Sequence, residues 1–169
     1  MGVALSMTLD QAAGKTGLER LLGRLEERSP LMARLAGYLE ASTRQRWATQ
    51  SGPGGHPWKP SIRARLTGGL TLIDSHQLLE SITTAHTGES AEVGTNKIYG
   101  PMMHFGGTVT AKAGPSLRFR IPGVGWRSPK SVEIPGRPFL GVDRDDEDQI
   151  GQIIFDYLAE TAPTAEAAA

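Results

Sequence analysis

The chain of 169 residues contains no cysteine, has no excess charge of either sign and has few aromatic residues. The absence of cysteine excludes a disulfide scaffold, a thiol nucleophile, an iron–sulfur cluster and a zinc site with cysteine ligands. A net charge of zero argues against a strongly basic protein that wraps nucleic acid. No apolar run approaches the roughly 18 residues of a membrane span, and the first ten residues lack the basic segment of a secretory signal. We therefore expect a mixed globular protein that neither crosses a membrane nor is secreted.

Charge is unevenly distributed along the chain, although the total is zero. Residues 41–73 carry five basic residues and no acid, and residues 107–138 carry six basic residues and one acid. Residues 143–160 carry seven acids and only one arginine. Separate basic and acidic surfaces can complement copies of the same molecule head to tail and close a ring. Ordinary surface charge, with acids at the start of a helix, explains the pattern equally well.

Helical periodicity of the apolar residues predicts three longer helices. They cover residues 18–25, residues 29–50 with Ser29 as the N-cap, and a stretch from Asp143 or Asp145 to Leu158. Asp74 or Ser75 is the expected N-cap of a further short helix over residues 76–82. Glycine and proline, 21 and 11 residues, exceed the usual share of about 12% and indicate a loop-rich chain.

Alternating apolar residues predict strands in the rest of the chain. Residues 3–9 have this pattern, and residues 91–94 and 98–99 are expected to form strand segments around a turn. Between 107 and 138 the pattern predicts a long hairpin in which residues 117–121 turn at Pro122–Gly123 and pair with residues 131–134. Three glycines and two prolines in residues 51–57 indicate a loop, which we expect Trp58 to anchor on the core.

These elements do not alternate as the βαβ units of a parallel sheet do. The sequence therefore predicts the α+β class, with one antiparallel sheet and a long projecting hairpin packed against two or three helices. We expect a single domain over residues 1–161, with flexible loops at about 51–60 and 107–134. Residues 162–169 are of low complexity and are expected to form a disordered tail.

Catalytic chemistry has little support in the sequence. The four histidines, at positions 56, 76, 86 and 104, do not have the spacing of metal ligands on one helix. His104 is the best candidate for a general base, with Asp74 or the acids of the last helix as orienting partners, but a structural role is favoured. The acidic run 143–148 lacks the glycine and the closing glutamate of a calcium loop. A metal-assisted hydrolase that uses His104 and Asp74 is retained only as an alternative.

Five short segments recur in a recognisable order. Residues 52–60 contain the pattern PxGxxW, residues 72–82 are similar to LIDTGxLxxSI, and residues 93–100 to VGT…YA. Residues 105–107 and 134–141 are similar to HQFGG and IPARPFLG. In this order the segments resemble the phage virion morphogenesis, or tail-completion, family, and the matches run from about residue 30 to residue 158.

The chain departs from the motifs of that family at two places. His76 stands where the family pattern has glycine, and Met103 stands at its histidine, with His104 at the glutamine position. A catalytic histidine would be lost by this change, so we interpret the motifs as architecture. Glycine permits positive φ, Asp74 caps a helix, and Arg137 is free to pair with an acidic helix start. The motif residues are Trp58, Asp74, Phe105, Gly106, Arg137, Pro138 and Phe139.

The resemblance implies a structural protein that completes a phage tail or joins the tail to the head. Such proteins act as a ring of identical subunits, often six, around the DNA channel at the neck, without a cofactor or a reaction. The implied partners are further copies, the head connector, and the tail tube or terminator proteins. The implied location is the virion, and the host cytoplasm during assembly.

The charge pattern adds candidate contact residues to this expectation. The basic hairpin and the acidic helix start are expected to contact neighbouring subunits or partner proteins, through Arg118, Arg120, Arg127, Lys130, Asp145, Asp146 and Asp148. Arginines of the hairpin could instead meet phosphates, which makes a DNA-contacting adaptor a further alternative.

Overall fold

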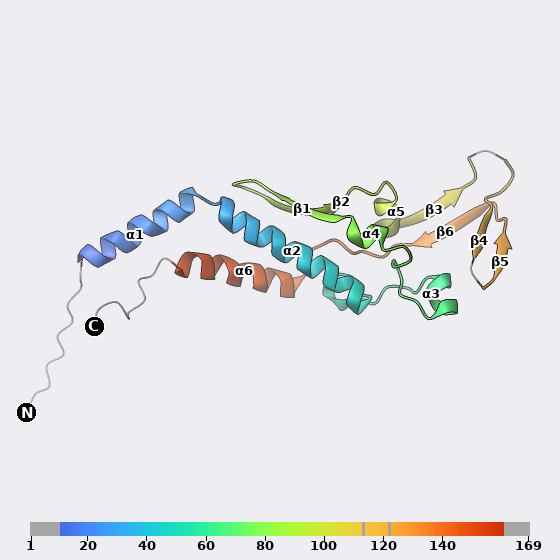
Figure 1. The fold of residues 1–169 in the computed structure, drawn as a ribbon, viewed down its shortest axis with the longest axis horizontal. Helices are drawn as coiled ribbons and strands as arrows, with labels where there is room; N and C mark the ends of the chain where they lie inside the picture. Colours follow the sequence, from blue (N-terminus) through green and yellow to red (C-terminus); the bar gives the residue numbers. More distant parts are fainter. Residues whose placement is uncertain (1–10, 113, 122, 161–169) are drawn as a thin grey trace, which may run out of the picture.

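The computed structural model describes residues 11–160 apart from residues 113 and 122. The strand expected at residues 3–9, Pro122 of the expected turn and the tail 162–169 lie outside the described residues. Helices and antiparallel strands lie along an elongated body, with helix α1 at one end and the long hairpin at the other (Figure 1). The α+β class expected from the sequence is confirmed.

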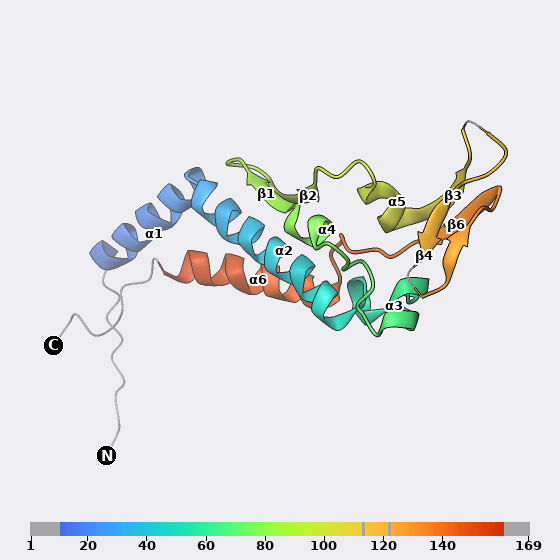
Figure 2. The ribbon, with the colours of Figure 1, turned by 45° about the vertical axis from the view of Figure 1, so that its right-hand side comes forward.

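Two long helices lie side by side along the body and carry much of the core (Figures 1 and 2). Helix α2 (Ser29–Thr49) packs against helix α6 (Arg144–Ala159), and helix α1 (Gln11–Glu26) precedes them. The three longer helices expected from periodicity are thus confirmed. Shorter helical segments, between them, are η1 (Pro53–Gly55), α3 (Ile62–Thr67), α4 (Gln77–Glu80) and α5 (Gly100–Phe105). No helix in the described part of the chain is long and apolar enough to cross a membrane.

The strands form three separate two-stranded antiparallel sheets in place of the single sheet expected. Strand β1 (Ile82–His86) pairs with β2 (Ala91–Thr95), and this hairpin packs against α2. Strand β3 (Gly106–Thr110) pairs with β6 (Ser131–Pro135), and between them β4 (Phe119–Ile121) pairs with β5 (Gly125–Arg127). Each pair is short, and no third strand joins it among the described residues.

The long hairpin, which runs from β3 to β6, is present, but the pairing of its strands differs from the prediction. Residues 131–134 pair with β3, so the partner of Phe119–Ile121 is the nearer strand Gly125–Arg127. The N–H of Val124 donates to the carbonyl of Ile121 at 3.0 Å and closes a tight turn. The alternation of residues 117–121 identified a strand correctly but could not choose between two partners. Residues 98–99, expected as a strand, form the turn that leads into α5.

Two apolar clusters hold the elements together. The larger one consists of Trp47, Trp58, Leu78, Ile82 and Phe139, all buried, and joins α2 to the loop after it, α4, β1 and the segment before α6. The smaller one joins α2 to α6 through Leu31, Leu35 and Tyr157. The expected burial of Trp58 is confirmed.

A buried ion pair links α2 to the first turn of α6. Arg46 Nη2 lies 2.6 Å from Asp146 Oδ2, and Tyr38 and Ser42 donate hydrogen bonds of 2.8 and 2.6 Å to Oδ1. Arg46 also donates to the carbonyl of Phe139 at 3.1 Å. Both ions are almost fully enclosed, so every charged atom needs these partners to offset its loss of water. Burial, followed by the hydrogen bond to Asp146, raises the pKa of Tyr38 to about 12.

The caps of the helices explain where α6 begins and correct two expectations. Asp143 accepts from the N–H of Asp146 and Asp146 accepts from the N–H of Asp143, which makes a reciprocal capping box. Ser29 does not cap α2, because the N-cap residue is Arg28 and makes no side-chain hydrogen bond. Asp74 does not cap α4 either, since the N-cap residue His76 has a left-handed backbone and no side-chain cap bond.

The C-terminal end of helix α1 contacts the body through Arg24, which lies beside Arg34 of α2 and Glu160 at the end of α6. Arg24 donates to the carbonyl of Tyr157 at 2.5 Å, and the guanidinium groups of Arg24 and Arg34 lie over the Tyr157 ring. Glu160 accepts from Arg34 at 2.7 and 3.0 Å and from Arg24 at 3.2 Å. These hydrogen bonds, those from Arg34 first, lower the pKa of Glu160 to about 2.

Replacing Asp146 with asparagine is expected to destabilise the fold strongly. Asp146→Asn leaves the Arg46 guanidinium buried without a counter-charge, a change that costs about 3–5 kcal/mol. The matched control is Asp145→Asn, which removes an exposed carboxylate from the neighbouring position. Urea unfolding of both variants measures the difference, and equal midpoints would contradict the role given to the ion pair.

The contribution of Glu160 to the stability of the fold is expected to depend on pH. Because the pKa of Glu160 is lowered in the folded protein, its ion pairs stabilise the fold above the unfolded value of about 4.5 and are lost as the pH falls towards 2. The melting temperatures of the native chain and Glu160→Gln should differ at pH 6 and converge near pH 2. A difference that is independent of pH between 6 and 2 would contradict the assignment.

Candidate functional site

The motif segments found in the sequence meet at one junction in the fold. The indole N–H of Trp58 donates to the carbonyl of Pro138 at 2.8 Å, and the ring lies 5.7 Å from that of Trp47 in an edge-on arrangement. Phe139 is fully buried and packs against Trp47 at 5.0 Å. A loop near the middle of the chain and a segment 80 residues later are therefore fixed to each other and to α2.

Arg137 has a different role from the one expected. Its guanidinium is buried and donates to the carbonyls of Lys59 and Pro135 at 2.8 and 3.2 Å, and burial lowers its pKa. No carboxylate among the described residues forms an ion pair with it. The arginine that pairs with the acidic helix start is Arg46. Its position could have been found from the sequence, because Arg46 lies seven residues after Leu39 on the inward side of α2.

Two glycines of the junction are required by the close approach of backbone segments. Gly106 has φ of +76°, and a Cβ atom there would lie 2.4 Å from the nitrogen of Gly136. A Cβ atom on Gly52 would lie 2.7 Å from the carbonyl oxygen of Pro138. A side chain at Gly106 would separate β3 from the segment after β6. A side chain at Gly52 would separate the loop 51–60 from Pro138.

His104 is part of the same junction and is held as a hydrogen-bond acceptor. Its Nδ1 accepts from the N–H groups of Phe139 and Leu140 at 3.3 and 3.4 Å, and its ring packs edge-on against Phe139 and Phe105. Burial lowers the pKa of His104, and the charge of Arg46 lowers it further. The neutral ring is the form that these contacts need. Phe105 itself is mostly exposed and covers the His104 ring from outside.

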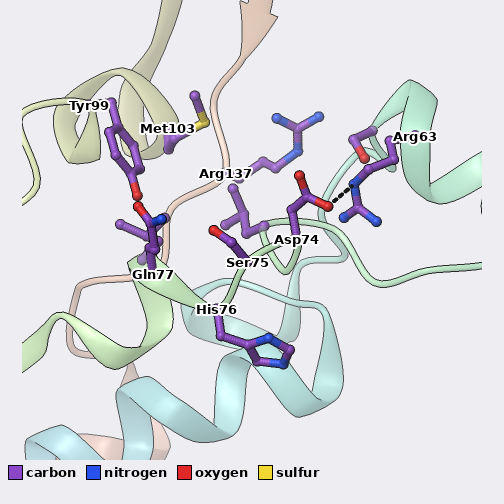
Figure 3. Close-up of a pocket in the computed structure, with 11 residues that line it drawn as sticks. Arg63, Asp74, Ser75, His76, Gln77, Tyr99, Met103 and Arg137 are labelled. Atoms are coloured by element: carbon purple, nitrogen blue, oxygen red, sulfur yellow. Dashed lines mark ion pairs between the residues drawn. The ribbon is translucent and has the colours of Figure 1, made fainter. Parts of the chain in front are cut away.

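Asp74 lies at a shallow cavity of about 270 Å³ beside the junction, and the lining of this cavity also includes Met103 and Arg137 (Figure 3). Its carboxylate is exposed and pairs with Arg63 Nε at 3.5 Å, and no described contact joins it to His104. Arg63 donates in turn to the carbonyls of Leu70 and Ile73, so it holds the turn before α4. The structure does not bring Asp74 and His104 together as a catalytic pair.

The backbone at this cavity explains one departure from the family pattern. His76, at the position of the family glycine, has φ of +61°, and Leu72 has the same value. Glycine reaches this left-handed conformation without strain, whereas a residue with a Cβ atom is disfavoured there. The fold therefore keeps the turn that the glycine would provide, although the residue here is a histidine, which is one of the residues that line the cavity (Figure 3).

The candidate contact residues lie on two surfaces. Arg118, Arg120, Arg127 and Lys130 are exposed on the long hairpin, and the Arg118 guanidinium lies 5.0 Å above the exposed Trp126 ring. Asp145 and Asp148 are exposed on the first turns of α6. Asp146, expected with them, is buried against Arg46 and is not accessible to a partner. In the described ranges, no group of three histidine, aspartate or glutamate residues could hold a metal ion.

Loss of the Trp58 ring is expected to loosen the junction. Trp58→Ala removes a buried aromatic side chain and its hydrogen bond to Pro138, which costs roughly 3–5 kcal/mol. The control is Trp126→Ala, because Trp126 is exposed on the hairpin. Denaturant unfolding of both variants measures the difference, and an unchanged midpoint for Trp58→Ala would contradict the role of Trp58.

Comparison with known proteins agrees with the motifs. Residues 9–159 match the phage virion morphogenesis family. The chain is 34% identical to the Mu-like prophage FluMu G protein 2 of Haemophilus influenzae over 144 residues, which is 85% of this chain and 87% of that protein. No solved structure matches. The match over most of the chain, together with this relative, shows that the chain belongs to the phage virion morphogenesis family.

Proposed function

We propose that this protein completes the phage tail or joins the tail to the head, as one subunit of a ring at the neck. Membership of a virion morphogenesis family supports a structural role in the particle. The proposal rests on one observation: the residues of the family motifs hold the fold together and are not exposed as a reactive site. Trp58, Gly106, Arg137 and Phe139 are engaged in one internal junction, and the exposed charges lie elsewhere.

The two charged surfaces supply the contacts that such a ring needs. The basic residues of the long hairpin meet further copies, the head connector, or the tail tube and terminator proteins, and the acids Asp145 and Asp148 offer a complementary surface. The protein then acts in the virion after assembly in the host cytoplasm. The hairpin projects from the end of the elongated body, where it can reach a neighbour (Figure 1).

The same geometry supports architecture over catalysis. Both backbone N–H groups that point at His104 Nδ1 belong to the junction, so the atom that a general base would use is already occupied. Asp74 is paired with Arg63 at the surface of another element. We therefore assign the protein no reaction and no cofactor.

A contact with DNA in the channel is the second candidate, and the hairpin favours it. Four exposed cations and an exposed tryptophan on one projecting element are the combination that binds nucleic acid backbones and bases. If all four cations meet phosphates of duplex DNA, a plot of the logarithm of the affinity against the logarithm of the salt concentration should have a slope of about −3.6. Binding that does not depend on salt would exclude this candidate.

Genetic complementation tests the proposed function. We expect deletion of the gene from the phage to give heads and tails that electron microscopy finds unjoined or unfinished, and the native gene to restore infectious particles. We expect the particle number to fall by at least about ten-fold when alanine replaces the four hairpin cations Arg118, Arg120, Arg127 and Lys130. The expected cause is a loss of partner affinity of at least about 1.4 kcal/mol. The control is Lys59→Ala, which removes an exposed cation that lies on neither of the two charged surfaces. Joined, infectious particles in the absence of the protein would contradict the proposal.

A further inference from the structure

Helix α1 directs its apolar face away from the rest of the molecule. Leu18, Leu22 and Leu25 follow each other at spacings of four and three residues, and each leaves about half of its surface exposed. On the opposite side, Arg20, Gly23 and Arg24 of the helix, and Glu27 directly after it, line a cavity with Tyr157 and Glu160 of the body. With about 100° per residue, the leucine row and this polar row point in opposite directions. The side of α1 that contacts the body is polar, and the side that a core would bury is free.

A second exposed apolar surface lies on and just after α3. Ile62 and Leu66 are one helical turn apart, Leu70 follows, and each again exposes about half of its surface. Ala64, on the other side of α3, is the buried residue that faces the body. The α3 patch, defined as Ile62, Leu66 and Leu70, is thus also turned outward.

The two surfaces lie at opposite ends of the elongated body. In both ribbon views, α1 stands at the blue end and α3 lies beyond the far end of α2 (Figures 1 and 2). Surfaces so placed cannot cover each other within one molecule. They can meet between two copies that are arranged head to tail.

Charge favours this pairing over a pairing of two α1 helices. Glu19 and Glu26 are exposed on one edge of the leucine row, and Arg65 is exposed beside Ile62 and Leu66. None of the three forms an ion pair with another described residue. Two copies of α1 packed antiparallel through their leucines would bring the edges that carry Glu19 and Glu26 towards each other, with the cation Lys15 near the N-terminal end of the row, whereas α1 against α3 brings these acids towards a cation.

We propose that the leucine row of α1 in one copy docks on the α3 patch of the next copy. Such a heterologous contact uses two different surfaces, so it repeats from subunit to subunit and closes a ring where the rotation allows. The inference rests on the proposed function in taking self-assembly as the purpose of the contact. It adds an apolar contact to the charged surfaces described above and names the two elements that meet.

Cysteine cross-linking tests the contact directly, because the chain has no cysteine of its own. Leu22→Cys and Leu66→Cys chains, one of them enlarged by a tag, are mixed at high concentration and treated with an oxidant or a short bismaleimide. We expect a covalent heterodimer from the mixture and none from either chain alone. The control mixture pairs Leu22→Cys with Ile98→Cys, since Ile98 is exposed on another surface.

Solution mass gives an independent measurement on folded variants. Leu22→Glu and Leu66→Glu should each weaken self-association, measured by light scattering over a range of concentrations, by about ten-fold or more. Ile98→Glu should leave it unchanged, and circular dichroism should find all three folded, because the replaced side chains are exposed. Changing both Glu19 and Glu26 to arginine should weaken self-association. Adding Arg65→Glu to the same chain should restore it, because every copy then carries both reversed surfaces.

The outcomes separate this inference from the proposed function. Cross-linking of Leu22→Cys with itself would overturn it in favour of paired α1 helices, and a monomer at all concentrations with no heterodimer would overturn it altogether. If Leu22→Glu complements the deleted gene fully while the deletion blocks particle formation, the inference fails and the function stands. Complete particles without the protein would remove the function, whatever the cross-linking gives.

Discussion

The ion pair between Arg46 and Asp146 determines how the two long helices and the motif segment meet. Arg46 reaches from α2 to the first turn of α6 and to the carbonyl of Phe139. Phe139 fills the core beside Trp47, and the residue before it accepts the hydrogen bond of Trp58. Since both charges are buried, the pair stabilises only one register of α2 against α6. The junction, the loop 51–60 and the start of the long hairpin all take their positions from that register.

Local patterns were enough to predict the parts of the fold whose signal lies within one segment. The helices α2 and α6 and the burial of Trp58 follow from apolar spacing, a proline at a helix start and acids near the α6 N-terminus. The pairing of the hairpin strands did not follow, because strands of three to five residues carry no register of their own. The partners of Arg137 and Asp74 depend on segments far away in sequence. Arg46 was missed because a charged residue is expected on the outside of a helix.

The division of the strands into three two-stranded sheets separates the core of this protein from the surfaces that we propose contact partners. Strands β1 and β2 lie against α2, β3 begins and β6 ends at the junction, and β4 and β5 contact mainly each other. Buried residues of the family motifs thus hold the body, and the exposed cations occupy the part furthest from it (Figures 1 and 2). A subunit built in this way can change what it touches without changing how it folds.

The long hairpin has a consequence for how the sequence can diverge. Substitutions at exposed positions usually change the free energy of unfolding by less than about 0.5 kcal/mol, whereas those in a packed core cost several times more. Residues of β4 and β5 are therefore free to follow changes in a partner, and the residues around Phe139 are not. Over evolutionary time, the tip of the hairpin should drift with each phage's own neighbours while the junction stays recognisable.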